Sequence, residues 1–169
     1  MKDITWSYKN FNDLTNKELY EIFRLRLAVF VVEQNCPYQD ADGKDLKAMH
    51  VLGYPSPTPP AGRAGLPLRE RAHTPELIAY ARILPPNISY QEVSIGRVVT
   101  SQKARKTGAG KMLMEKSMEI IKNEFGSVPI RIGAQAYLEN FYSDFGFKRV
   151  SENYLEDNIP HLEMLFVPR

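Results

Sequence analysis

The sequence predicts one domain of the mixed α/β class, in which a mixed sheet carries helices on its faces. Its length of 169 residues suits a single core that buries most apolar side chains. Periodic segments follow in the order strand, helix, three strands, helix, strand, helix, two strands. The early strands are close enough for antiparallel hairpins, and the later strand–helix–strand unit suits a parallel right-handed crossover.

The N-terminal half is expected to hold a helix between strands. The expected strands are 4–8, 50–54 and 77–84. A capping region at 12–16 precedes a helix that should end near 31–34, and a polar, turn-rich segment follows at 35–43. The helix is expected because apolar residues recur at three- and four-residue spacing, at Leu19, Ile22, Phe23, Leu27 and Phe30.

Residues 55–75 form a proline-rich stretch between two of these strands and hold six of the twelve prolines. Most connections between strands are short, so a link of this length is unusual. We interpret it as an inserted, largely unstructured surface loop within a single domain, residues 1–169. The alternative is a lid over an active site.

The C-terminal half is expected to continue the alternation. Its expected strands are 92–100, 128–134, 147–150 and 162–167. A Gly- and Lys-rich loop at 101–111 leads into a helix that ends at 125–126, and a short helix at 137–145 ends with Gly146 at its C′ position. The apolar side of the longer helix consists of Met112, Leu113, Met118, Ile120 and Ile121.

Composition limits the partners and the compartment. The 22 basic and 20 acidic side chains leave a net charge of +2, which gives no electrostatic footprint for nucleic acid or an anionic membrane. A single cysteine, Cys36, excludes an internal disulfide and fits a reducing cytoplasm. The polar N-terminus has no signal core, and the apolar runs are too short to span a bilayer. We therefore expect a cytoplasmic protein.

The segment around 98–111 predicts a phosphate site. A strand leads into a loop with Gly108 and Gly110, and the loop opens a helix. Backbone N–H groups in the first turn of a helix lack partners, and the helix dipole adds positive potential there. The glycines let the backbone turn tightly and approach a ligand. Arg105, Lys106 and Lys111 add charge around this cradle.

Two nucleotide motifs fail at this loop. A P-loop needs a glycine where Arg105 stands and a hydroxyl residue where Met112 stands. A Rossmann fingerprint needs a third glycine where Leu113 stands, and it belongs after the first strand. The remaining alternative is an ordinary basic loop that caps a helix.

Residues 105–110, Arg-Lys-Thr-Gly-Ala-Gly, resemble the Arg/Gln-x-x-Gly-x-Gly/Ala signature of the GNAT superfamily of N-acetyltransferases. Residues 141–147 carry a second pattern similar to that family's, Phe-Tyr-x-x-x-Gly-Phe. The resemblance covers nearly the whole chain except 55–75. Similarity to the ElaA-like branch lies in residues 30–40, 79–84, 95–98, 133–136 and 157–161.

The resemblance implies a fold and a reaction. The fold would be a central mixed, mostly antiparallel sheet of six to seven strands, with helices on both faces and a splay between the two central parallel strands. The reaction would be direct attack of an amine on acetyl-coenzyme A, the cosubstrate, without a metal. The acceptor would be a small-molecule or peptide amine that the ElaA-like branch does not identify, and a homodimer is possible.

The resemblance also implies cofactor-binding residues. The backbone of Arg97, Val98 and Val99 would lie along the pantetheine arm, and an N–H near Val99 would stabilise the oxyanion. The pyrophosphate would bind at Arg105, Lys106, Thr107, Gly108, Ala109, Gly110 and Lys111. Further contacts are expected from Gln135, Asn140 and Tyr142. Many members have Asn where Gln135 stands and Ala where Leu138 stands.

Tyr142 resembles the family's general acid, since a phenol can protonate the departing thiolate at neutral pH. The alternative for Tyr142 is a buried core aromatic. Candidates for the general base are Glu33, His50 and His161, with water as a possible relay. Arg24 and Arg26 would either bind the acceptor or lie on a solvated helix face. Cys36 lies between Asn35 and Pro37 in a turn, and no nucleophilic role is assigned to it, because such a role would need a base nearby.

Two other functions stay open. An acyl-homoserine-lactone synthase-like acyltransferase shares the scaffold but needs S-adenosylmethionine and another acyl donor. A non-catalytic acetyl-coenzyme A-binding or interaction module would bind the donor without turnover.

Overall fold

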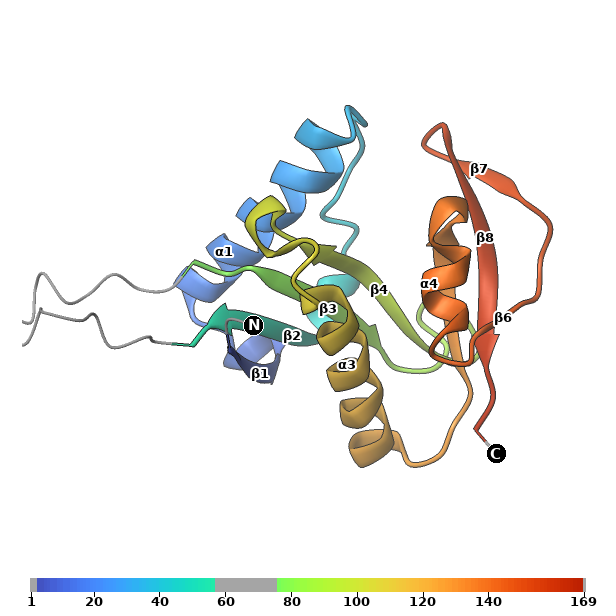
Figure 1. Cartoon of the computed structure of the whole chain (residues 1–169). Coiled ribbons are helices and arrows are strands. Elements are labelled where there is room, and N and C mark those ends of the chain that lie inside the picture. The colour runs from blue at the N-terminus through green and yellow to red at the C-terminus, as the bar shows by residue number, and fades with distance from the viewer. Residues whose placement is uncertain (1–2, 57–75, 169) are drawn as a thin grey trace, which may run out of the picture.

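The computed structural model describes residues 3–56 and 76–168, which form an eight-stranded sheet with helices on both faces (Figure 1). The strands are β1 (Ile4–Asn10), β2 (Met49–Pro55), β3 (Ala79–Leu84), β4 (Val93–Thr100), β5 (Ile130–Gln135), β6 (Lys148–Arg149), β7 (Tyr154–Glu156) and β8 (Ile159–Phe166). The α-helices are α1 (Asn16–Arg26), α3 (Ala109–Phe125) and α4 (Glu139–Ser143). Short helical turns lie at η1 (Phe11–Asp13), η2 (Leu27–Glu33), η3 (Lys44–Lys47), η4 (Gln102–Ala104) and η5 (Ala136–Leu138).

The sheet is mostly antiparallel, as the sequence predicts. Its order is β1-β2-β3-β4-β5-β8-β6, with β7 also paired to β8. Only β4 and β5 run parallel, and α3 forms the crossover between them. The expected six to seven strands become eight because β7 was not predicted.

The two central strands diverge soon after they meet. β4 and β5 pair only through Val93 with Ile130 and Ser94 with Arg131, although both strands continue beyond these residues. The sheet therefore splits into an arm of β1–β4 and an arm of β5–β8 that carries α4 (Figure 1). The predicted splay is confirmed.

Side-chain alternation along the strands builds one core on each face of the sheet. Val51 and Ala81 pack on the face that α3 covers, whereas their neighbours Leu52 and Tyr80 pack on the face that α1 covers. The buried residues of α3 are Ala109, Leu113, Met114, Ser117, Ile120 and Ile121. Helices on both faces are thus confirmed.

The first helix starts and ends where its sequence signals predict. The Thr15 side chain accepts from the Glu18 backbone N–H (3.2 Å), and the Glu18 carboxylate accepts from the Thr15 N–H (2.8 Å). This reciprocal capping box fixes the start of α1. The expected single helix changes to a π-helix over Leu27–Glu33, a geometry that often marks functional sites.

The hairpin of β7 and β8 corrects the expected C-terminal strand. β8 begins at Ile159 rather than 162, because Asp157 and Asn158 form a two-residue turn with Glu156 paired to Ile159. Both turn residues have positive φ, +50° and +65°, which Asp and Asn tolerate better than most side chains. The Asp157-Asn158 pair is therefore a sequence feature from which a hairpin turn can be predicted.

Other boundaries differ more modestly. The expected helix at 137–145 is divided between η5 and α4, and Gly146 takes the expected left-handed conformation, φ +88°. Pro55 was expected in the inserted loop but pairs with Ile4 at the end of β2. Residues 57–75 of that loop lie outside the described residues. Among the described helices, no span has the length and hydropathy needed to cross a membrane.

Candidate active site

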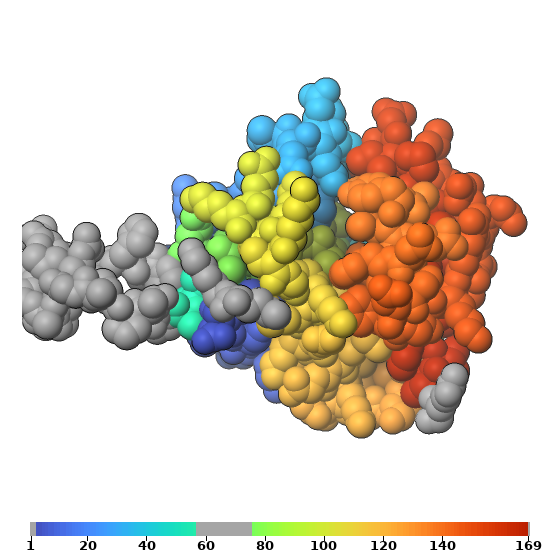
Figure 2. All heavy atoms as spheres, viewed as in Figure 1, coloured from blue at the N-terminus to red at the C-terminus, as the bar shows by residue number. Residues whose placement is uncertain are grey.

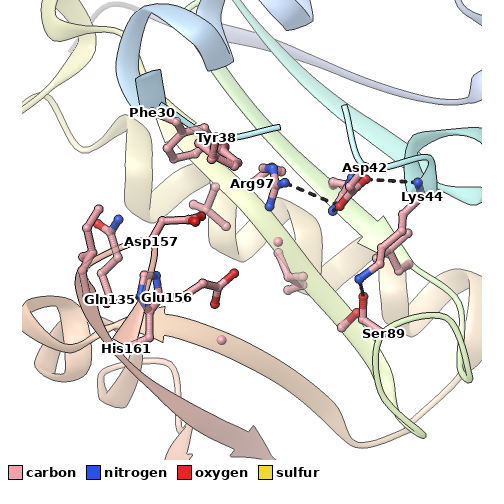
Figure 3. Close-up of a pocket in the computed structure, with 18 of the residues that line it drawn as sticks. Phe30, Tyr38, Asp42, Lys44, Ser89, Arg97, Gln135, Glu156, Asp157 and His161 are labelled. Carbon is pink, nitrogen blue, oxygen red and sulfur yellow. Dashed lines mark hydrogen bonds and ion pairs between the residues drawn. The ribbon is translucent and has the colours of Figure 1, made fainter. Parts of the chain in front are cut away.

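A cavity of about 460 Å³ lies where the two arms of the sheet diverge. The molecular surface is hollowed between the light-blue region of η2, the yellow 101–111 loop and the orange α4 (Figure 2). The cavity lining includes Ser94, Gly96, Arg97 and Val98 of β4, Gly133 and Gln135 of β5, Tyr142 of α4, and Glu156, Asp157 and His161 of the β7–β8 hairpin (Figure 3).

The 101–111 loop presents a run of backbone amides at the start of α3. Gly108 has φ +89°, a left-handed conformation that glycine adopts without strain, and Ala109 is the first helical residue. Arg105 N–H donates to Gln102 O (3.3 Å), and the next amide with a backbone acceptor is Met112, which donates to Gly108 O (3.1 Å). Among the described residues, the six amides of 106–111 have no protein acceptor. Free amides at the start of a helix are suited to bind an anion, which is the role that the sequence predicts for this loop.

Glu33 lies beside this loop and outside the cavity lining. Its carboxylate accepts from both terminal nitrogens of Arg105, at 2.9 Å for Nη2 to Oε2, and from Gln102 Nε2 (3.2 Å). The hydrogen bonds from Arg105 lower the pKa of Glu33, despite a smaller opposing effect of burial. The structure therefore makes Glu33 an anchor of the loop, in a position that does not suit the predicted base.

His50 does not reach the cavity either. It is fully buried on β2, where Nε2–H donates to Asp45 O (3.0 Å) and Nδ1 accepts from the Tyr80 hydroxyl (2.8 Å). Burial lowers its pKa, so the ring is held neutral inside the protein. The predicted role as a base does not fit this placement, because both ring nitrogens are occupied.

His161 is the one of the three base candidates that lines the cavity. Its Nδ1–H donates to Ile159 O (2.8 Å), and its ring stacks on Tyr154 with centroids 6.0 Å apart. With the proton fixed on Nδ1, Nε2 of the neutral ring is an acceptor. His161 is therefore the base candidate that the structure places at the cavity, whereas the sequence could not choose among the three.

Tyr142 is at once a core aromatic and a cavity residue. It is 6% exposed and packs edge-on against Phe141 and Phe147, at centroid distances of 5.0 and 6.2 Å. Burial raises the pKa of its hydroxyl, which stays protonated at neutral pH. The hydroxyl has no hydrogen-bond partner among the described residues, so it is a free proton donor that faces the cavity.

A β-bulge shapes the β4 wall. Tyr80 pairs with Val99 and Arg82 with Gly96, so Arg97 and Val98 together stand opposite Ala81 alone. Arg97 has φ +51°, and bulges of this kind redirect side chains next to active sites. Val98 lines the cavity, while Val99 packs on the α1 face.

A buried ion network holds the wall behind the bulge. Arg26 is fully buried and pairs with Asp40 and Asp45, both at 2.8 Å. The predictions for Arg26, acceptor binding or a solvated face, are therefore wrong. Arg82 donates to Asp42 at 2.7 and 2.8 Å. Burial alone would raise the pKa of Asp42, but Arg82 outweighs it and lowers that pKa.

Sequence reasoning missed this network because its members come from distant parts of the chain. Arg97 Nε donates to Asp40 Oδ1 (2.9 Å), which also accepts from the Tyr38 hydroxyl (2.7 Å). The Arg97 guanidinium also lies over the Tyr38 ring, 5.4 Å from its centroid. Local spacing patterns in a sequence cannot predict an ion pair between residues that are 57 positions apart, such as Asp40 and Arg97.

Gln135 bridges the two arms at the cavity. Its amide exchanges hydrogen bonds with Gln34 (3.3 and 3.2 Å), and its Oε1 also accepts from the Tyr137 hydroxyl (2.7 Å). Asn140 is exposed on α4 and is not among the cavity-lining residues. Cys36 is buried, and its thiol donates to Asp157 O (3.4 Å) rather than to a base.

Residues 73–167 match the family model for the acetyltransferase (GNAT) domain. The chain is 42% identical to Protein ElaA of Escherichia coli over 95% of both chains, and 41% identical to a UPF0039 protein of Schizosaccharomyces pombe over 97% of both. It is also similar to the crystal structure of an acyl-CoA N-acyltransferase from Pseudomonas aeruginosa, with a TM-score of 0.82 and 40% identity, covering 98% of this chain and 100% of the other.

Proposed function

Because the chain belongs to the GNAT family of acetyltransferases, we propose that it transfers an acetyl group from acetyl-coenzyme A to an amine by direct attack. The observation that carries this proposal is the pairing of the open splay with the six uncommitted amides of 106–111. Those amides and the α3 dipole suit a pyrophosphate. The pantetheine arm would lie along the β4 bulge toward the cavity.

The chain's own residues then have separate tasks. An N–H near Val99 would stabilise the oxyanion, a contribution of ~3 kcal/mol in comparable sites. Holding the amine next to the thioester removes several kcal/mol more from the barrier. The amine nitrogen forms the new N–C bond and loses its proton to His161 Nε2, directly or through water. The C–S bond breaks, and Tyr142 gives its proton to the thiolate.

The first experiment tests donor and turnover separately. Acetyl-coenzyme A should raise the melting temperature, because a ligand that binds only the folded state stabilises it. Thiol release should then be measured against a panel of amines. A non-catalytic binding module would be stabilised by the donor but release no thiol, and an acyl-homoserine-lactone synthase-like enzyme would respond to S-adenosylmethionine instead.

The Tyr142→Phe variant tests the acid. It should keep the melting-temperature shift caused by acetyl-coenzyme A, because the aromatic packing is unchanged, and should lose about a hundredfold in kcat. Tyr20→Phe is the matched control, since Tyr20 is exposed on α1 and lies outside the cavity lining. An unchanged kcat in Tyr142→Phe would remove Tyr142 from the mechanism.

A cytoplasmic location is part of this proposal, because the lone Cys36 provides no internal disulfide.

A further inference from the structure

The hairpin wall of the cavity carries two carboxylates without a partner. Glu156 ends β7 and Asp157 begins the turn to β8, and both residues line the cavity. Among the described residues, neither carboxylate forms an ion pair or accepts a hydrogen bond. Figure 3 shows both pointing from the hairpin into the space that faces Arg97.

The guanidinium groups that line the same cavity are already neutralised by the chain. Arg97 Nε donates to Asp40 at 2.9 Å, and Arg82 donates to Asp42 at 2.7 and 2.8 Å. Because each guanidinium is already paired with a carboxylate, its attraction for an incoming anion is weak. A ligand therefore experiences the hairpin carboxylates more strongly than these arginines.

Lys44 is the remaining cation of the lining, and it lies across the cavity from the hairpin (Figure 3). Its Nζ donates to Ser89 Oγ at 2.9 Å. The cavity is thus polarised, with uncommitted negative charge on the side of His161.

The end of the cavity next to the hairpin also offers a free hydrogen-bonding group to a ligand. Tyr142 is 6% exposed, lines the cavity and has no hydrogen-bond partner among the described residues. Although the ring is buried, the hydroxyl is not among the buried polar atoms without a partner, so it is accessible to a molecule in the cavity. The cavity volume of about 460 Å³ is within the range of small-molecule sites.

We propose that the acceptor is a small primary amine with a second positive charge, of the α,ω-diaminoalkane type. Glu156 and Asp157 bind the distal ammonium, while the reacting nitrogen lies near His161 and Tyr142. This inference rests on the acetyl transfer proposed above. Only the reacting nitrogen has to lose a proton, so the distal charge persists through the reaction and keeps the acceptor anchored.

Calorimetric titration of the full chain tests this without turnover, in the presence and absence of coenzyme A. The probes are α,ω-diaminopentane, hexylamine and ω-aminohexanoate, which share five methylenes and end in an ammonium, a methyl or a carboxylate. The diamine should bind about tenfold more tightly than the other two. Its affinity should fall as salt is added, because ions screen the attraction.

Glu156→Gln and Asp157→Asn remove the charges with little change in shape, and Asn tolerates the positive φ at 157. Each should weaken diamine binding by up to about fivefold, and the pair together by roughly tenfold, whereas hexylamine binding stays unchanged. Glu115→Gln, on the exposed face of α3, removes the same charge outside the cavity lining and should have no effect.

Two results would overturn the inference. One is that the double variant binds the diamine as tightly as the unsubstituted protein does. The other is that the unsubstituted protein binds ω-aminohexanoate or hexylamine more tightly than the diamine. The proposed transfer fails differently, through absence of stabilisation by acetyl-coenzyme A or of thiol release. Charge-dependent diamine binding without thiol release would support the cation site and refute the transferase.

Discussion

At the scale of single residues, environment decides which titratable groups are available for chemistry. His50 and His161 are the same residue type, each within one or two residues of the start of a strand. The fold buries the first between two hydrogen-bond partners, whereas the second lines the cavity and forms a hydrogen bond through Nδ1 alone among the described residues. Glu33, whose carboxylate is engaged by Arg105, is equally withdrawn from proton transfer.

The base assignment is tested by comparing two substitutions. His161→Ala should lower kcat by about a hundredfold, because general-base catalysis typically contributes that much. Glu33→Gln should leave kcat within a few-fold and leave the shape of the pH–rate profile unchanged, since the ion pair only anchors the loop. The opposite pattern, a normal His161→Ala enzyme and an inactive Glu33→Gln enzyme, would reverse the assignment.

At the scale of elements, the start of α3 and the β4 bulge prepare the site. The left-handed Gly108 ends the loop at the start of α3, and the amides of 106–111 have no protein acceptor among the described residues. The bulge at Arg97 and Val98 interrupts the β3–β4 ladder beside the splay. Both are local departures from regular geometry that leave main-chain groups available for a ligand.

The two glycines of this loop should respond differently to alanine. Gly108→Ala places a side chain at φ +89° and should lower the free energy of unfolding by about 1 kcal/mol. Gly110 has ordinary φ, and an added Cβ would meet Phe141 at 3.8 Å, so Gly110→Ala should keep full stability. It should still weaken acetyl-coenzyme A binding if the ligand approaches this backbone closely. Denaturant titration and calorimetry measure the two effects; normal donor affinity in Gly110→Ala would place the ligand farther away.

At the scale of the whole molecule, buried charges tie the 40–45 segment to both α1 and the sheet. Arg26 comes from α1, Arg82 from β3 and Arg97 from β4. Breaking one member of such a network leaves its partner buried and uncompensated. The wall of the cavity is therefore coupled to global stability.

Stability should fall in two steps on acidification. His50 has a lowered pKa in the folded protein. When the pH falls below its ordinary pKa of 6.5, the unfolded chain is therefore protonated at this residue while the folded chain is not, and unfolding is favoured. This step has a slope of up to about 1.4 kcal/mol per pH unit. Asp42 and Asp45 also have lowered pKa values, so their stabilisation is lost as pH drops below 3.8.

Urea titrations at a series of pH values measure both steps. His50→Gln should remove the step below 6.5 and keep the lower one. A parent protein whose unfolding free energy is constant between neutrality and about pH 5 would contradict the buried neutral state of His50.

The sequence alone determined features that depend on neighbours a few residues apart. These include the helix cap at Thr15, the left-handed Gly108 and Gly146, the order of strands and helices, and the family pattern around Tyr142. Local dihedral preferences and apolar periodicity are sufficient for such features.

Only the tertiary structure decided which distant side chains meet. Arg26 is buried because Asp40 and Asp45 satisfy it, 14 and 19 residues away, and no local pattern encodes that pairing. The cavity likewise forms between arms that separate after two residue pairs of β4 and β5. Desolvation and long-range pairing, set by the packed fold, decide which of the predicted groups can react.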